Sequence, residues 1–239
     1  SGFRKALEVC WLLVIFLIPV FFSPVSHQPF ILNKALLLQV LVITMLALWL
    51  ADRLVNPRGQ PVPKWRNAAR SPLHISILVF GAISAVATTA SITPAISFRG
   101  SYVWQSGLLQ LIYWMLFFLI IARHMRQRRQ IMRAVFTLLL SSAVVSIAGI
   151  GQHYLPGINV MLHWPATTSR VFSTTGNPLY LSVFLAMVIP FTIAFLFHYW
   201  PQKGKGIRGR KLFSPVALIA LLVLQFWCLG LAQYSFTFV

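Results

Sequence analysis

Two isolated arginines are the candidates for binding an anion that stand apart from the basic clusters of this 239-residue chain. Arg99 lies in the stretch SITPAISFRGSYVWQSGLLQ, and Arg170 opens the stretch RVFSTTGNPLYLS. Neither stretch contains a carboxylate that could neutralise its arginine. A planar guanidinium binds phosphate oxygens in a bidentate manner. The pair therefore predicts a shared site for an external anion, most naturally a diphosphate, although each arginine alone could simply reach lipid headgroups.

The Gly-Asn-Pro sequence after Arg170 reads as the start of a helix. Pro178 suits the first helical turn, where its missing N–H would have no partner in any case. Asn177 is then in position to cap that turn, although Gly176 or Thr175 could take the same role. This interpretation explains the break in the apolar pattern, but it leaves the arginine itself unexplained.

Glutamines and histidines complete the set of candidate site residues. Gln105 and Gln152 lie toward the same predicted helix ends as the two arginines, and we expect them, together with Asn177, to extend a polar pocket there. Hydrogen bonding between helices is the ordinary role of a glutamine in a membrane. The histidines lack the spacing of metal ligands, and Glu8 and Asp52 alone cannot form a Mg²⁺ cluster. We expect no metal and no cofactor, and the sequence identifies no catalytic base.

The composition is that of an integral membrane protein. Hydrophobic residues make up 58% of the chain and charged residues 9%, with a mean hydropathy of +0.79, whereas soluble domains carry roughly 25% charged residues. Apolar runs of about 18 residues can cross the hydrocarbon core as helices. The pattern predicts an all-α fold, a single polytopic domain over 1–239, and about seven transmembrane helices. These are expected at approximately 6–23, 33–52, 74–95, 104–122, 131–152, 177–199 and 215–235.

Basic residues predict the orientation of these spans. Seventeen of the twenty lysines and arginines lie in the N-terminal segment and in the 53–70, 123–133 and 203–211 loops. The positive-inside rule places these loops and the N-terminus in the cytoplasm, and the C-terminus and both candidate arginines outside. The formal charge of +18 thus has a topological origin. We expect membrane lipids as partners and no nucleic acid.

Several segments together resemble the O-antigen ligase and O-antigen polymerase superfamily. They are SPLHISILVFGAISAVATTASITPAISFRGSYVWQSGLLQLIYWMLF, SIAGIGQHYLPG and RVFSTTGNPLYLSVFLAMVIPF, in this order. In that family an arginine, small residues and a Gly-Asn-Pro-Asn-like motif open a helix from the outer face. Here Leu179 stands at the last position of the motif. The resemblance covers roughly 30–239 and depends on the order and spacing of the segments.

The resemblance implies a metal-independent glycosyltransferase with a GT-C-like helical bundle in the bacterial inner (cytoplasmic) membrane. Such an enzyme transfers a glycan from a polyprenyl-diphosphate carrier to an acceptor at the outer face. Arg170, and more weakly Arg99, would contact the carrier diphosphate. Family members have further spans and a late outer loop that supplies a catalytic histidine, which nothing here matches. We therefore expect a truncated enzyme, its N-terminal half, or a short inactive relative.

Two other classes of protein fit parts of the same pattern. A non-catalytic multi-span subunit or scaffold of a larger membrane complex, with or without pigments, would suit the many spans and the Trp and Phe content. Its partners would then be other subunits of that complex. A transporter is disfavoured because no predicted span has a carboxylate near its middle.

The orientation can be tested by cysteine labelling. Cysteines at Gly59, Gln127 and Gly206, introduced singly into a cysteine-free background, should not react with an impermeant maleimide in intact cells, because all three loops are predicted to be cytoplasmic. Permeabilised cells provide the positive control. Efficient labelling of intact cells at any of the three positions would reverse the orientation and move both candidate arginines to the cytoplasmic face.

Overall fold

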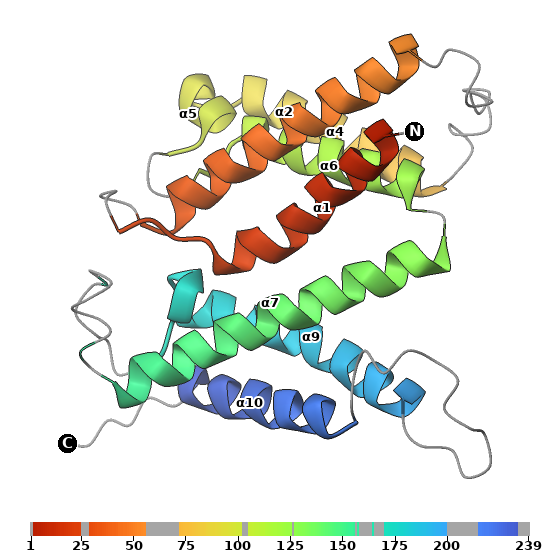
Figure 1. Cartoon of the computed structure of the whole chain (residues 1–239). Coiled ribbons are helices and arrows are strands. Elements are labelled where there is room, and N and C mark those ends of the chain that lie inside the picture. The colour runs from red at the N-terminus through yellow and green to blue at the C-terminus, as the bar shows by residue number, and fades with distance from the viewer. Residues whose placement is uncertain are drawn as a thin grey trace. The chain divides into compact units, whose positions relative to one another are not determined.

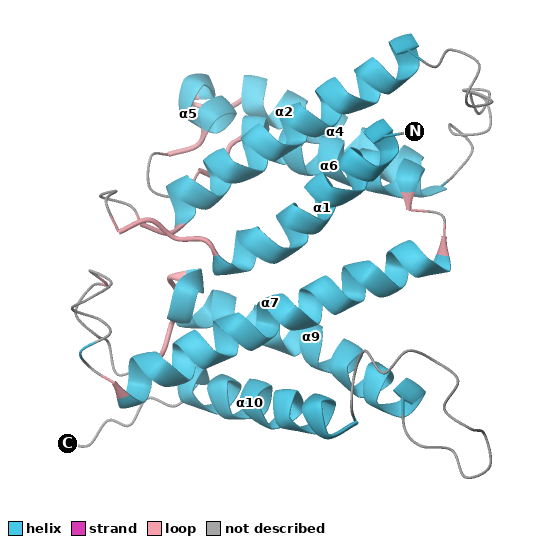
Figure 2. Ribbon diagram, viewed as in Figure 1, coloured by secondary structure: helices cyan, strands magenta, loops and turns pink. Residues whose placement is uncertain are grey.

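The structure, a computed structural model, describes residues 2–24, 29–55, 72–101, 105–125, 127–155, 157, 164, 170–199 and 215–233. The regular elements among these residues are all helical (Figure 2). This confirms the predicted all-α class. Contacts along the chain divide it into two compact units, the first formed by residues 1–14 and 31–131 and the second by residues 15–30 and 132–239.

The first unit is built from helices α2, α4, α5 and α6 together with the beginning of α1 (Figure 1). Their bounds are Gly2–Val20 for α1, Ile31–Val55 for α2, Pro72–Thr89 for α4, Pro94–Arg99 for α5 and Leu108–His124 for α6. Helix α6 is in contact with α2, α4 and α5. It is therefore the helix around which this unit is arranged.

Polar and small side chains join the helices of the first unit. Gln39 of α2 donates from Nε2 to Gln110 Oε1 of α6 at 3.0 Å. Helix α4 approaches α6 at Gly81, where a Cβ atom would come within 2.6 Å of Met115 Cε. In a bilayer, apolar side chains gain little by leaving lipid, so close packing and hydrogen bonds of this kind hold helices together.

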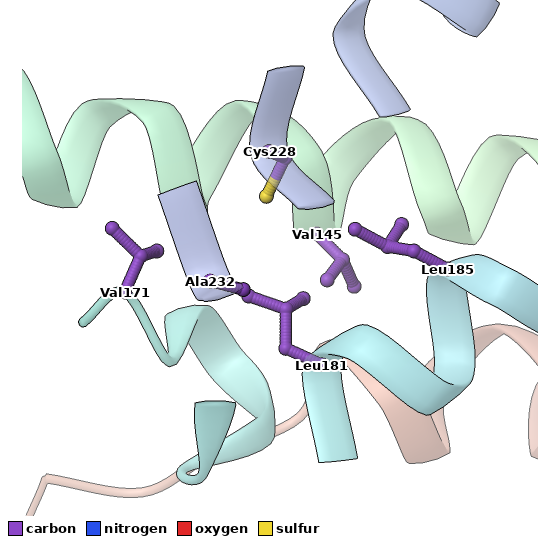
Figure 3. Packing of buried hydrophobic residues seen from close by; sticks show 6 residues of the cluster. All are labelled: Val145, Val171, Leu181, Leu185, Cys228 and Ala232. Carbon is purple, nitrogen blue, oxygen red and sulfur yellow. The ribbon is translucent and has the colours of Figure 1, made fainter. Parts of the chain in front are cut away.

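The second unit contains the rest of α1, most of α7, a short 3₁₀ helix η1, and helices α9 and α10. Their bounds are Arg128–Tyr154 for α7, Ser173–Thr175 for η1, Pro178–Tyr199 for α9 and Pro215–Gln233 for α10. Figure 3 shows one buried cluster of this unit, in which side chains from α7, α9, α10 and the segment before η1 meet. Its members are Val145, Val171, Leu181, Leu185, Cys228 and Ala232.

A buried glutamine links the three long helices of the second unit. Gln225 of α10 is 0% exposed. Its Nε2 donates to Ser142 Oγ of α7 at 2.8 Å, and its Oε1 accepts the Thr192 hydroxyl of α9 at 2.9 Å. Gln110 and Gln225 thus both have the ordinary role of a glutamine in a membrane, a hydrogen bond between helices.

Five of the described helices are long and apolar enough to cross a membrane, namely α2, α4, α7, α9 and α10. The chain is therefore a multi-pass membrane protein by the length and composition of its helices. Helix α6 is shorter, with 17 residues, and α1 carries Arg4, Lys5 and Glu8 in its first turns. The total of seven spans, their orientation and the GT-C arrangement remain predictions. Most of the 53–70 and 203–211 loops lies outside the described residues.

The predicted break around Arg99 differs from the observed structure. The sequence predicts a span over 74–95 followed by a loop, but α4 ends at Thr89 and a second helix, α5, runs over Pro94–Arg99. Proline restricts the residue before it and fits the first position of a helix, so Pro94 separates the two elements. The next span was predicted to begin at 104, whereas α6 begins at Leu108.

The importance of the buried glutamine can be measured directly. Gln225→Leu should lower the free energy of unfolding by roughly 1 to 2 kcal/mol, because it removes two interhelical hydrogen bonds and leaves Ser142 and Thr192 without this partner. Thermal or chemical unfolding in detergent provides the measurement. Gln233→Leu, at the exposed end of α10, is the matched control and should change little. Equal effects of the two substitutions would contradict a role for Gln225 as the link.

Candidate anion site

The stretch that begins at Arg170 turns at once into the interior of the second unit. Arg170 is exposed, whereas Phe172 is 5%, Ser173 0% and Thr174 3% exposed. This segment between α7 and α9 is not a surface loop. Its backbone N–H and C=O groups therefore need partners inside the protein, because neither lipid nor an apolar core provides them.

Gln152 of α7 supplies the central partner. Its Oε1 accepts the N–H groups of Phe172 at 3.0 Å and Ser173 at 2.7 Å. The Ser173 hydroxyl donates back to the Val145 carbonyl of α7 at 2.7 Å. These three bonds hold the turn against one face of α7. Gln152 was expected to extend a polar pocket; in the structure it is 3% exposed and anchors the backbone beyond Arg170.

The end of α1 holds the other side of the turn. The Thr174 hydroxyl donates to the Pro19 carbonyl at 2.9 Å. Gly176 has a φ of 80°, in the left-handed region, and a Cβ atom there would overlap the ring of Phe30. Glycine is required at this position for both reasons, since a larger residue would be strained and would also displace the ring.

Four aromatic rings pack around this turn. Phe172 lies 5.7 Å from Phe30 and 5.6 Å from Trp164, measured between ring centroids. Phe22 lies 5.5 Å from Trp164 in an edge-on arrangement. Offset and edge-on pairs of this kind stabilise a core beyond the area they bury. The cluster and the hydrogen bonds together fix the backbone that follows Arg170.

The predicted start of the next helix is confirmed. Helix α9 begins at Pro178, and Asn177 Oδ1 accepts the N–H of Leu179 at 2.8 Å. Asn177 is therefore the cap, and the alternatives at Gly176 and Thr175 are excluded by their other roles. The hydroxyl of Thr175 donates to the Phe172 carbonyl at 2.6 Å instead.

Arg99 and Gln105 belong to the first unit, whereas Arg170, Gln152 and Asn177 belong to the second. Arg99 is exposed and ends α5, and Gln105 donates its backbone N–H to the Ser101 carbonyl at 2.9 Å. Within the second unit, Gln152 of α7 is hydrogen-bonded to the stretch of chain that carries both Arg170 and Asn177. A site that Arg99 and Arg170 share stays a prediction.

The candidate residues do not form a recognisable metal centre. Among the described residues, no group of three or more His, Cys, Asp or Glu side chains could hold a metal ion. His153 lies in the last turn of α7 and is exposed, with its ring centroid 4.7 Å from that of Tyr154. His27 and His163 lie outside the described residues.

Sequence reasoning missed the buried polar face of α7. Ser142, Ser146, Gly149 and Gln152 recur at helical spacing and are all buried. The signal was present as small and polar residues at intervals of three or four within an otherwise apolar run. A helix surface of this kind packs against protein rather than lipid, since lipid offers no hydrogen-bond partners to its polar groups.

Comparison of the chain with models of known protein families, with curated proteins and with solved structures finds no match.

A substitution at the turn can test its tight packing. Gly176→Ala should lower the free energy of unfolding by more than about 1 kcal/mol, the usual cost of a side chain in the left-handed region, and overlap with Phe30 adds to this cost. Gly230→Ala is the matched control, because nothing lies within 4 Å of a Cβ atom there. If thermal unfolding in detergent shows no difference between the two variants, the turn is not held in this conformation.

Proposed function

We propose that this protein binds a polyprenyl-diphosphate-linked glycan and takes part in its transfer to an acceptor at the outer face of the bacterial inner membrane. The observation that supports this proposal is the position of Arg170. Its exposed side chain is attached to a segment whose next residues are buried and hydrogen-bonded to α7. The order of segments that resembles the O-antigen ligase and polymerase superfamily supports the choice of ligand.

A guanidinium at this place suits a diphosphate for a physical reason. Its planar fork can donate two parallel hydrogen bonds to phosphate oxygens, and it stays charged at any physiological pH. When the glycan leaves its carrier, negative charge develops on the diphosphate leaving group. A positioned cation stabilises that charge more in the transition state than in the ground state, and so favours transfer.

The rigid attachment of Arg170 increases this effect. A side chain on a mobile loop would lose conformational entropy on binding, whereas one that follows a fixed backbone loses less. The N–H of Leu179 at the start of α9 is already bonded to Asn177, so in this proposal the ligand contact comes from the arginine rather than from that amide. The base that activates the acceptor is not assigned to any residue.

The proposal is tested by a conservative substitution. Arg170→Lys keeps the charge but loses the bidentate geometry, so it should reduce glycan transfer tenfold or more, because hydrogen bonds to charged groups contribute roughly 1.5 to 3 kcal/mol. Arg170→Ala should reduce transfer further. Transfer is measured in membranes that carry the protein in its full natural length, at matched expression.

Asn177→Ala provides the matched control for this experiment. Loss of the helix cap should lower the free energy of unfolding by about 1 kcal/mol while leaving transfer per folded molecule nearly unchanged. Wild-type transfer by Arg170→Lys would mean that the arginine only reaches lipid headgroups, as a lysine also can. That result would favour the non-catalytic subunit or scaffold instead.

A further inference from the structure

Two buried nitrogen donors beside the turn have no acceptor among the residues that the structure describes. They are Nε2 of Gln152 and Nε1 of Trp164. Gln152 is 3% exposed and Trp164 6% exposed. Burying a donor without a partner is unfavourable, and buried polar atoms in proteins nearly always have one. A further hydrogen-bond acceptor is therefore expected at each of these donors.

Both donors belong to side chains that contact Phe172. Gln152 Oε1 accepts the Phe172 N–H at 3.0 Å, and the Trp164 ring lies 5.6 Å from the Phe172 ring. Because the carbonyl oxygen of Gln152 is bound to two backbone N–H groups, the amide cannot be reversed without breaking both bonds. An indole N–H can only donate. Each of the two side chains can therefore only be satisfied by a hydrogen-bond acceptor at its nitrogen.

We infer that Gln152 Nε2 and Trp164 Nε1 form an acceptor position for a phosphate oxygen of the ligand that Arg170 contacts, an inference that rests on the proposed function. Arg170 precedes Phe172 by two residues. Residues 15–30 and 132–239, which make up the second unit, contain no Asp or Glu. A phosphate there meets two neutral donors and a cation, and no acidic side chain of this unit repels it.

Gln152→Glu distinguishes a phosphate oxygen from a bridging water. The carboxylate still accepts the N–H groups of Phe172 and Ser173, so the turn keeps its anchor. A water molecule can rotate and donate to the carboxylate, whereas an ionised phosphate has no proton to donate and is repelled. The variant should therefore leave the turn intact and weaken only the binding of a phosphate ligand.

The measurement is the affinity of the purified full chain in detergent for farnesyl diphosphate at pH 8, with farnesol and inorganic diphosphate as further probes. We expect Gln152→Glu to bind farnesyl diphosphate at least about tenfold more weakly than the wild type, as expected for a lost hydrogen bond to a charged group. Farnesol binding should not change. Hydrogen exchange at Phe172 and Ser173 should stay slow, which shows that the turn is still held.

Trp164→Phe is a second variant that does not depend on the turn anchor. It keeps an aromatic ring in the cluster with Phe172 but removes the N–H group together with part of the bicyclic ring, so it should also bind farnesyl diphosphate several-fold more weakly. Trp114→Phe, in the first unit, is the matched control and should bind like the wild type. If hydrogen exchange at Phe172 and Ser173 becomes fast in Gln152→Glu, the turn is no longer held in that variant. The affinity of Trp164→Phe for farnesyl diphosphate then tests the phosphate position on its own.

The outcomes separate this inference from the proposed function. Wild-type affinity in both variants overturns the inference, since the two donors then contact only water, and leaves the role of Arg170 standing. Weakened binding of inorganic diphosphate in both variants, without any preference for the prenyl compound, supports the phosphate position and contradicts a lipid-linked ligand. Failure of the wild type to bind either phosphate compound overturns both.

Discussion

The turn between α7 and α9 depends on one side-chain carbonyl. Gln152 Oε1 accepts two consecutive backbone N–H groups from a buried, non-helical turn. Without it, Phe172 and Ser173 would each lose a buried hydrogen bond, a cost of about 1 to 3 kcal/mol for each group. The residues that come next in the chain are Gly176, the cap Asn177 and the first residue of α9, so the anchored turn determines where α9 can begin.

Hydrogen bonds between side chains also join the long helices to one another. Gln39 and Gln110 join α2 to α6 in the first unit, and Gln225 joins α10 to both other long helices of the second. Small residues bring the helices close enough for this. Gly149 of α7 is one example, because a Cβ atom there would come within 2.7 Å of Cys228 Sγ. Each unit thus has interhelical hydrogen bonds of its own, part-buried in the first unit and buried in the second, rather than apolar packing alone.

Local chemistry explains which parts of this structure could be predicted from the sequence. The helix from Pro178 to Tyr199 was predicted to within one residue, because its start is encoded in consecutive residues, Asn177 as cap and Pro178 in the first turn. Helix α5 was missed, because six residues give too short a pattern to tell a helix from a loop. The anchoring role of Gln152 was missed because its partners are backbone groups twenty residues farther along the chain, a pairing that only the folded chain brings about.

The two candidate arginines differ in how well the backbone beside each of them is packed. Arg99 ends a helix of six residues, none of which is buried. Arg170 instead leads into residues that are almost completely enclosed and hydrogen-bonded on both sides of the turn. Snorkelling to a headgroup requires only a long side chain and sets no condition on the backbone that carries it. Holding an anion in one geometry requires a fixed backbone beneath the guanidinium, because ordering a mobile segment opposes binding. On this physical ground Arg170 is the stronger candidate for a specific anion contact, and Arg99 for an interfacial anchor.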